Sequence, residues 1–294
     1  MKNHNRKFVL TTIIPLFTEI AIFMVIPIIG TLIISFMKYN PIANGHENSF
    51  IGIDNYIKLF SDSSFLTALK NTLFFTFAAV AINIVISLFI AVLISQLKSN
   101  KTRSFFRMMM FLPCIAPMVA SSVVWVRTLF PKDGLLNSIL TFFGANAISF
   151  TGDANYLMTS IIIFTLWAAL GYNIILFCAG IDGIPSDIYE AANIDGAGTF
   201  KKFFKVTLPL LARTMAFVTL MTLISYFQMF AQFEVLAVKG GPKESGLVLT
   251  SYIYKTAFGY REMGYAAAIS VVLFIVILIV SIIQKRMDKV DWEY

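Results

Sequence analysis

The chain has 294 residues, of which 58% are hydrophobic and only 13% are charged. A soluble globular domain carries about 25% charged residues, so this composition excludes an ordinary soluble domain and indicates an integral membrane protein. The net charge of +7 does not indicate nucleic-acid binding, because the lysines and arginines lie mostly between apolar runs and no basic recognition motif accompanies them.

Six apolar segments are long enough to cross the hydrocarbon core of a bilayer, which takes roughly 20 helical residues. Because lipid offers no hydrogen-bond partners to the backbone, each segment is predicted to be an α-helix. The sequence therefore predicts an all-α polytopic membrane protein of the cell membrane. Its six transmembrane helices are expected at residues 9–37, 71–97, 105–130, 157–180, 211–237 and 264–284.

The first apolar run follows a basic start, MKNHNRKF, and no small-residue cleavage site ends it. We expect this run to be retained as a membrane anchor. Glu19 lies inside it, where a charge at mid-membrane costs at least about 2.5 kcal/mol. Either the Glu19 carboxyl is protonated or paired, or the span begins near Ile20 and leaves Glu19 at the surface. The second interpretation is preferred.

The distribution of basic residues predicts the orientation of the chain. With both termini in the cytoplasm, 14 of the 23 lysines and arginines fall in cytoplasmic segments, as the positive-inside rule requires. These segments are residues 1–8, 98–107, 181–213 and 285–294.

Three outer segments connect the spans. In residues 131–156, glycines and prolines predict a loop or a re-entrant turn. In residues 238–263, Gly240-Gly241-Pro242 is expected to end the fifth span. Residues 38–69 are expected to contain a short amphipathic helix after two turn signals, Asn40-Pro41 and Asn44-Gly45.

The two cysteines, Cys114 and Cys178, both lie in apolar runs and are not placed for a disulfide bond. The sequence has no CxxC pair and no cluster of histidine and cysteine, so we predict no metal site and no catalytic residue. It also lacks the GxxxxGK[ST] phosphate loop of an ATPase. We therefore expect a chain that is not an enzyme and binds no cofactor of its own.

One cytoplasmic segment, residues 184–209, is too polar to span the membrane. Pro185-Ser186 predicts the start of a helix in which the Ser186 side chain caps free backbone amides. Gly196 and Gly198 weaken this helix. One face, at i, i+3, i+4 and i+7, carries mostly small side chains: Ile188, Ala191, Ala192 and Asp195. Small residues allow close approach of another chain, which favours a protein partner over a helix that only lies on lipid.

The second half of this segment alternates three phenylalanines with lysines from Phe200 to Lys205. Such a pattern suits the membrane interface, with the rings at the acyl boundary and the ammonium groups among phosphates. Leu208-Pro209 then leads into the fifth span.

The spacing of residues in this segment follows a known motif. Glu190-Ala191-Ala192 is followed after three residues by Gly196 and after nine more by Val206-Thr207-Leu208-Pro209. The stretch resembles the EAA loop of binding-protein-dependent ABC importer permeases. The likeness extends over nearly the whole chain, including LWAALGYNIILFCAG at 166–180 and GGPKESG at 240–246. It is greatest to carbohydrate permeases of the maltose and glycerol-3-phosphate type.

The resemblance implies the type I ABC importer permease fold, with both termini in the cytoplasm and a cytoplasmic coupling helix in residues 184–209. It implies a first helix and outer loop at 1–69, a permease core at 70–286 and a cytoplasmic tail at 287–294.

The implied partners are a second homologous permease, two cytoplasmic ATPase subunits that bind ATP and Mg, an extracytoplasmic solute-binding protein, and the sugar itself. The coupling helix would lie in a cleft of an ATPase subunit. The residues expected at that contact are Glu190, Ala191, Ala192, Asp195, Gly196 and Ala197.

Polar and aromatic residues inside spans are candidates for the substrate path, because such groups usually face a bundle interior or a wet cavity. The fourth span offers Trp167, Gly171 and Asn173. In the fifth, helical spacing places Tyr226, Phe227 and Phe230 on one broad face. Aromatic faces suit sugar rings, although ordinary helix packing explains such stripes equally well. The resemblance favours the surroundings of Gly171 and the face from Tyr226 to Phe230 as cavity lining.

Two further polar features are less specific. Gln228 and Gln232 are predicted to form a separate polar stripe on the fifth span, with Gln228 counted among the path residues. Asn83 in the second span is expected to form a hydrogen bond between helices rather than to bind a sugar.

Two alternative functions stay open at this point. The EAA loop does not separate a sugar importer from an ABC importer for an amino acid, a peptide or a phosphate ester. A stand-alone secondary transporter would need membrane carboxylates for ion coupling, and only Glu19 is a candidate.

Overall fold

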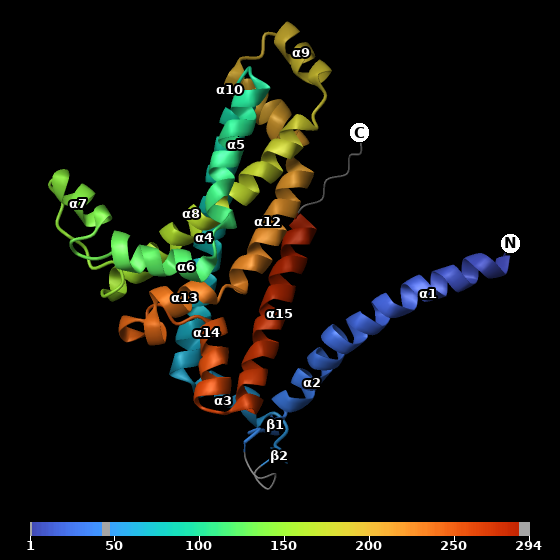
Figure 1. Cartoon of the computed structure of the whole chain (residues 1–294), viewed down its shortest axis with the longest axis vertical. Coiled ribbons are helices and arrows are strands. Elements are labelled where there is room, and N and C mark those ends of the chain that lie inside the picture. The colour runs from blue at the N-terminus through green and yellow to red at the C-terminus, as the bar shows by residue number, and fades with distance from the viewer. Residues whose placement is uncertain (1, 43–47, 288–294) are drawn as a thin grey trace. The chain divides into compact units, whose positions relative to one another are not determined.

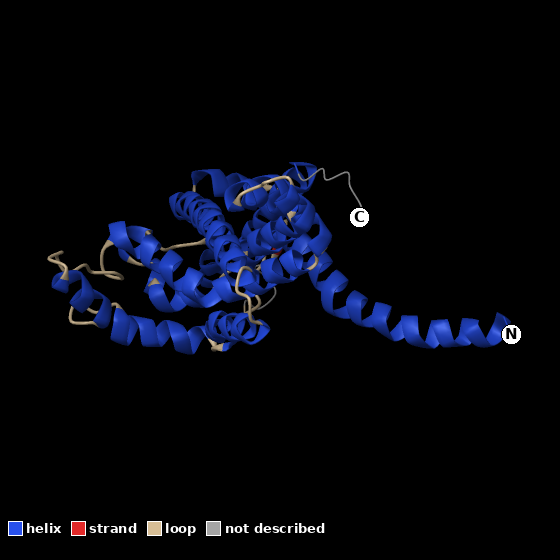
Figure 2. Cartoon of the chain, turned by 90° about the horizontal axis from the view of Figure 1, so that it is seen from above, coloured by secondary structure: helices blue, strands red, loops and turns tan. Residues whose placement is uncertain are grey.

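The computed structural model describes residues 2–42 and 48–287, with all side chains among them except those of residues 2–7, 9 and 287. Helices make up most of this part of the chain (Figure 2). The strands described are one antiparallel pair, β1 (Met37–Lys38) and β2 (Ser49–Phe50), in which Met37 lies opposite Phe50. The all-α prediction is confirmed.

The contacts divide the chain into two compact units, residues 1–66 with 252–275, and residues 67–251 with 276–294. The predicted parts at 1–69, 70–286 and 287–294 were drawn by function and stay a prediction. Residues 288–294 of the predicted tail, and the predicted turn at Asn44-Gly45, lie outside the described residues.

The first unit begins with a long apolar helix. It consists of α1 (Lys2–Ile20), a π-helical turn (Ala21–Val25) and α2 (Ile26–Ser35). The helix passes through Glu19 without a break, and its span-forming stretch begins at Leu10. The helix thus extends well before Ile20, and Glu19 is exposed on its surface. The interpretation that the membrane span itself starts near Ile20 stays a prediction. No residue in the most apolar part of this stretch is buried by the described protein, so its side chains need lipid or another chain as cover.

The predicted short amphipathic helix of the outer segment is present as α3 (Asp54–Ser61). Asn55 is buried, and its side-chain amide donates to the carbonyls of Ser35 (2.9 Å) and Met37 (3.0 Å), which attaches α3 to the end of α2. Leu59 is buried as well. On the other side of α3, Ile57 and Phe60 are exposed.

Asp62 joins several elements of this unit. One carboxylate oxygen accepts hydrogen bonds from the amides of Ser64 and Phe65 at the start of α4 (Ser63–Ser95). The other accepts from the hydroxyls of Tyr252 (2.5 Å) in α14 (Leu249–Tyr254) and Tyr265 (2.6 Å) in α15 (Met263–Met287). Burial alone would raise the pKa of Asp62, but the two tyrosine hydroxyls and the two amides together hold this pKa below its ordinary value.

The second unit contains most of the span-forming helices. α4, α5 (Asn100–Ile115), α8 (Ala154–Asp182) and α12 (Ala212–Phe227) make up its long helices (Figure 1). α5 and α8 pack side by side. They approach closely at Gly171, where an added Cβ would lie 2.0 Å from the carbonyl oxygen of Met110, so only glycine fits without moving the helices.

By length and composition, four described helices can cross a membrane, or six spans result if each of two bent helix pairs counts as one. The second, fourth and sixth predicted spans are confirmed as α4, α8 and α15.

The third predicted span is not one straight helix. α5 ends at Ile115, and α6 (Met118–Val124), followed by a π-helical turn (Trp125–Leu129), continues at an angle of 89° to it. Pro117 explains the break: it has no amide hydrogen to donate, and it drives Ala116 into an extended conformation with ψ of 135°.

The predicted fifth span at 211–237 is wrong at its end. α12 ends at Phe227, and α13 (Ala231–Leu236) is a separate helix before two short 3₁₀ turns, Val238–Gly240 and Pro242–Glu244. Gly240-Gly241-Pro242 therefore does not end the span, because the helix has already ended. α13 is anchored by Phe233, which packs edge-on against Phe75 of α4 with ring centroids 4.8 Å apart.

The outer segment 131–156 contains α7 (Leu135–Phe142) in addition to the predicted loop. The buried Asn137 donates to the carbonyls of Pro131 and Ile148 and accepts from the amide of Ile148. These bonds hold the loop ends together, so the segment is folded by its own polar groups.

Candidate coupling site and translocation path

The polar segment 184–209 forms three short helices at the cytoplasmic end of the predicted topology. These are α9 (Ser186–Ile194), α10 (Thr199–Lys202) with a π-helical turn (Phe203–Thr207), and α11 (Leu208–Leu210). They lie at the same end of the second unit as the start of α5 (Figure 1). The α10–α11 stretch meets α12 at an angle of 67°.

α9 begins as predicted at Ser186, but without the predicted cap. Pro185 occupies the N-cap position, and no side chain caps the free amides. The Ser186 hydroxyl instead donates to the Asp187 carboxylate at 3.3 Å. Because Ser186 is the first helical residue, its side chain is one position too late to serve as the cap.

α9 ends in a Schellman motif, which gives Gly196 a definite structural role. The amide of Ala197 donates to the carbonyl of Ala192 (2.9 Å), and that of Gly196 to the carbonyl of Asn193 (3.0 Å). Gly196 has φ of +69°, the left-handed conformation that glycine adopts without strain. An added Cβ there would meet nothing within 4 Å, so this glycine is required by backbone conformation and not by crowding within the chain.

The residues predicted to contact an ATPase lie together on α9 and its C-terminal turn. None of the α9 residues is buried within the described protein. Glu190, Ala191, Asp195 and Gly196 are exposed, and Ala192 and Ala197 are half-buried. Ile194, which the sequence did not single out, is 87% exposed at the end of this helix. Together with the exposed Ala191, Ile194 makes the outer surface of α9 partly apolar.

The Phe/Lys stretch follows the predicted pattern only in part. Phe200 and Phe204 are exposed, which leaves the prediction of a membrane-interface position open for them. Phe203 instead packs against the buried cluster that includes Leu88, Ile174 and Phe177, so the prediction that all three rings face lipid is wrong. Phe203 and Phe204 are adjacent in the helix and point to different sides, which explains why one is packed and the other exposed.

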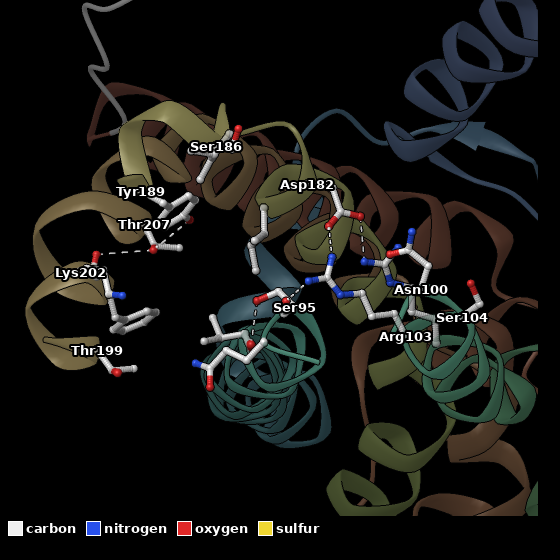
Figure 3. A pocket seen from close by; sticks show the side chains of 16 residues that line it. Ser95, Asn100, Arg103, Ser104, Asp182, Ser186, Tyr189, Thr199, Lys202 and Thr207 are labelled. Atoms are coloured by element: carbon white, nitrogen blue, oxygen red, sulfur yellow. Dashed lines mark hydrogen bonds and ion pairs between the residues drawn. The ribbon is translucent and has the colours of Figure 1, made fainter. Parts of the chain in front are cut away.

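A cavity of about 880 Å³ lies between the coupling segment and the ends of the long helices (Figure 3). Its lining is polar and carries three cationic side chains, Arg103, Arg107 and Lys202, and one carboxylate, Asp182. Lys202 donates to the Asn193 side chain at 2.8 Å.

Three polar contacts connect the coupling segment and its neighbours around this cavity. Arg107 donates to Asp182 at 2.8 Å, and a nitrogen of Arg103 lies 4.0 Å from the same carboxylate. Tyr189 of α9 and Thr207 form a hydroxyl–hydroxyl hydrogen bond of 3.1 Å. In the sequence the arginines indicated only the membrane topology, and nothing singled out Asp182.

A second polar site lies inside the helix bundle. The Asn173 amide donates to Asn83 (2.7 Å) and to the Thr222 hydroxyl (2.9 Å), and the Asn83 amide donates to the Tyr226 hydroxyl (2.7 Å). All four side chains are buried and come from α4, α8 and α12. The prediction that Asn83 joins helices by a hydrogen bond is confirmed.

Comparison with known proteins settles the family. A model of the "Binding-protein-dependent transport system inner membrane component" family matches residues 83–289. This chain belongs to that family. The permease is therefore a multi-pass protein of the cell membrane and a transport component, as predicted.

Relatives of the permease span most of its length. It is 35% identical to the arabinooligosaccharides transport system permease protein AraP of Bacillus subtilis, over 93% of this chain and 86% of that protein. It is 32% identical to the lactose transport system permease protein LacF of Rhizobium radiobacter, over 92% and 90%. It is 33% identical to the sn-glycerol-3-phosphate transport system permease protein UgpA of Escherichia coli, over 82% and 81%.

The fold of the permease matches that of a solved transporter chain. In the crystal structure of a bacterial alginate ABC transporter in complex with an alginate pentasaccharide-bound periplasmic protein, one chain superposes with a TM-score of 0.85. The match covers 98% of this chain and 96% of that chain at 23% identity. The predicted type I permease fold is confirmed.

The structure places the predicted path residues in different surroundings. Asn173 and Tyr226 belong to the buried network, and Gly171 faces the backbone of α5. Trp167 is partly exposed and lies against Trp125, with ring centroids 5.3 Å apart. Phe227 is buried edge-on against Phe77.

The predicted common face of Tyr226, Phe227 and Phe230 does not form, because α12 ends at Phe227 and Phe230 lies in the break before α13. The predicted polar stripe fails for the same reason: Gln228 is exposed at the end of α12, and Gln232 is buried in α13. Helical spacing places residues on one face only as long as the helix continues.

Proposed function

We propose that this permease forms, with a second homologous permease, the membrane path of an ATP-driven importer for a sugar or oligosaccharide. An extracytoplasmic solute-binding protein delivers the solute, and two cytoplasmic ATPase subunits bind ATP and Mg and drive transport. The observation that carries the proposal is α9, a helix with no buried residue that ends in an exposed Ile194.

The geometry of α9 supports its role as the coupling helix. A nine-residue helix is too short to be stable by itself in water, so a helix held only by its ends needs further contacts. Its small residues allow a cleft wall to approach closely, and Glu190 and Asp195 are exposed for pairing with basic groups of an ATPase. The Schellman motif at Gly196 turns the chain sharply, so that α9 projects as a separate element.

The proposed substrate class rests on the relatives. Those named above include permeases whose names specify arabino-oligosaccharides and lactose, and a further one, 30% identical over 79% of this chain, is named for diacetylchitobiose uptake. UgpA, named for sn-glycerol-3-phosphate, favours a phosphorylated polyol as the second candidate. Seven residues are proposed to lie on or beside the helices that line the translocation path: Trp167, Gly171, Asn173, Tyr226, Phe227, Gln228 and Phe230.

The substrate class is tested by uptake into proteoliposomes that contain the permease with its partner permease, ATPase and binding protein. The solutes compared are arabinotriose, lactose, diacetylchitobiose and sn-glycerol-3-phosphate. We expect ATP-dependent uptake of one of the sugars. Uptake of the phosphate ester alone would support the second candidate, and uptake without ATP would contradict the proposal.

The coupling role is tested with a pair of matched glycine variants. Gly196→Trp and Gly144→Trp both place a large side chain at a left-handed glycine where an added Cβ meets nothing within 4 Å. The two substitutions therefore carry the same backbone strain, but only Gly196 lies on the proposed docking surface. We expect Gly196→Trp to abolish ATPase binding or its stimulation, and Gly144→Trp to retain both. Wild-type transport by the Gly196→Trp complex would show that α9 is not the coupling helix.

A further inference from the structure

Three long helices of the second unit meet at one group of charged side chains. Arg103 and Arg107 lie one turn apart near the start of α5, and Asp182 is the last residue of α8. Arg103 also donates through Nε to the carbonyl of Leu97 (2.7 Å) and through Nη2 to that of Ser95 (2.5 Å), at the end of α4. Figure 3 shows Arg103 between Ser95 and Asp182.

We propose that Arg103, Arg107 and Asp182 are positioning residues that pass movement of α9 to the cytoplasmic ends of α4, α5 and α8. The inference rests on the proposed function, because it assigns a role in the coupling of ATP hydrolysis to transport. It concerns side chains outside the predicted docking surface and outside the predicted substrate path.

The chain between Asp182 and α9 is too short to absorb a large displacement. Only Gly183, Ile184 and Pro185 separate Asp182 from Ser186. Three extended residues span about 10 Å at most, and the proline restricts them further. A movement of α9 therefore reaches the end of α8, and the Asp182 carboxylate carries it to α5.

The contacts of the two arginines connect Asp182 to both α5 and α4. Arg107 bonds Asp182 at 2.8 Å, and its Nε is buried without a hydrogen-bond partner in the described protein. The ion pair with Asp182 therefore helps to hold the guanidinium in place. Arg103 has two bonds to the end of α4 and lies 4.0 Å from Asp182, so α4 is connected to the same carboxylate.

A purely stabilising role is a poor explanation of this cluster. Between a quarter and two-fifths of each side chain is exposed, and ion pairs with this exposure contribute little to stability because solvent screens them. A pair that contributes little to folding still restricts the relative position of two helix ends. Loss of the pair should therefore change coupling far more than it changes stability.

The test uses the assembled complex in proteoliposomes and the panel sugar that the wild type takes up. The variants are Asp182→Asn, Arg107→Gln, their combination, and the charge-retaining Asp182→Glu. Lys98→Gln is the matched control, because Lys98 is an exposed cation between α4 and α5. The readouts are sugar molecules transported per ATP hydrolysed, the amount of assembled complex and the melting temperature.

We expect each neutral single variant to lower the transport-to-hydrolysis ratio about tenfold and the double variant to be no worse than either, as for residues that act as one pair. Asp182→Glu and Lys98→Gln should keep the wild-type ratio, and all variants should keep assembly and melting temperature. Additive losses, a full ratio in the neutral variants, or a fall in melting temperature that matches the loss of coupling would overturn the proposal. If wild type itself shows no ATP-dependent uptake, the proposed function has failed instead.

Discussion

Replacement of Gly171 by alanine tests whether this glycine serves helix packing or lines the substrate path. An added Cβ would lie 2.0 Å from the Met110 carbonyl oxygen and 2.8 Å from Cα of Phe111. Carbon–oxygen contacts between helices run at about 3.3–3.6 Å, so α5 and α8 must separate by more than about 1 Å to admit the methyl group.

The size of the effect follows from two opposing terms. Overpacking costs about 1–3 kcal/mol, and the upper end applies because the obstructing atoms are backbone and cannot rotate away. Alanine in place of glycine stabilises a helix by about 1 kcal/mol. The net loss is about 2 kcal/mol, which corresponds to a fall of roughly 4–8 °C in melting temperature for a domain of this size. Size-exclusion chromatography of detergent-solubilised protein after heating measures this fall.

Two other glycines of the same region provide the controls. At Gly180 an added Cβ would meet the Thr214 side chain at 2.8 Å, which can move, so Gly180→Ala should give a smaller fall. At Gly183 the nearest atoms lie at 3.4 and 3.5 Å, which is ordinary contact, so Gly183→Ala should give none. The reasoning is refuted if Gly171→Ala melts together with Gly183→Ala, and a change in sugar uptake at unchanged melting temperature would indicate a cavity-lining role.

Three further predictions concern polar and close contacts. Because its pKa is held low in the folded state, Asp62 stabilises fully above the ordinary carboxyl pKa, and this contribution is lost as pH falls through the lower folded-state pKa. The difference in melting temperature between wild type and Asp62→Asn should therefore stay constant down to about pH 5 and shrink as pH falls below about 4. Tyr226→Phe removes the acceptor of a buried amide and should cost about 1 kcal/mol, with no effect from Tyr172→Phe at an exposed position. Gly264→Ala places a Cβ 2.0 Å from the Met37 carbonyl and should increase proteolysis of the outer segment, whereas unchanged proteolysis would show that the backbone relaxes.

The existence of the spans was predictable because apolar length alone distinguishes them from the loops. The shape of the spans was less predictable. The bend after α5 has a local signal in Pro117, which the prediction of a straight span at 105–130 did not take into account. The end of α12 has no such signal, since Gln228, Met229 and Phe230 include neither glycine nor proline. Packing of α13 against its neighbours decides that break, and packing between distant segments is not visible in local sequence.

The candidate coupling site shows the same division between local and distant determinants. The start of α9 and the turn at Gly196 follow from local residue types, and the resemblance assigned their role. The Arg107–Asp182 pair joins residues 75 positions apart and could not be derived from spacing. A basic residue near a span end has a sufficient explanation in membrane topology, so nothing in the sequence indicated that this arginine has a partner.

α4 and α8 contribute to both polar sites, the charged group around Asp182 and the buried network around Asn173. Asn83 meets Asn173, and further along both helices the Cys178 thiol meets the Ala91 carbonyl, so the two helices run in the same direction. The nine residues from Asn173 to Asp182 rise about 13.5 Å along α8, beyond the range of about 10 Å within which substitutions couple. The stability cost of Tyr226→Phe should therefore be the same in wild type and in the Asp182→Asn background. A different cost in that background would mean that α4 and α8 couple the two sites as one rigid pair.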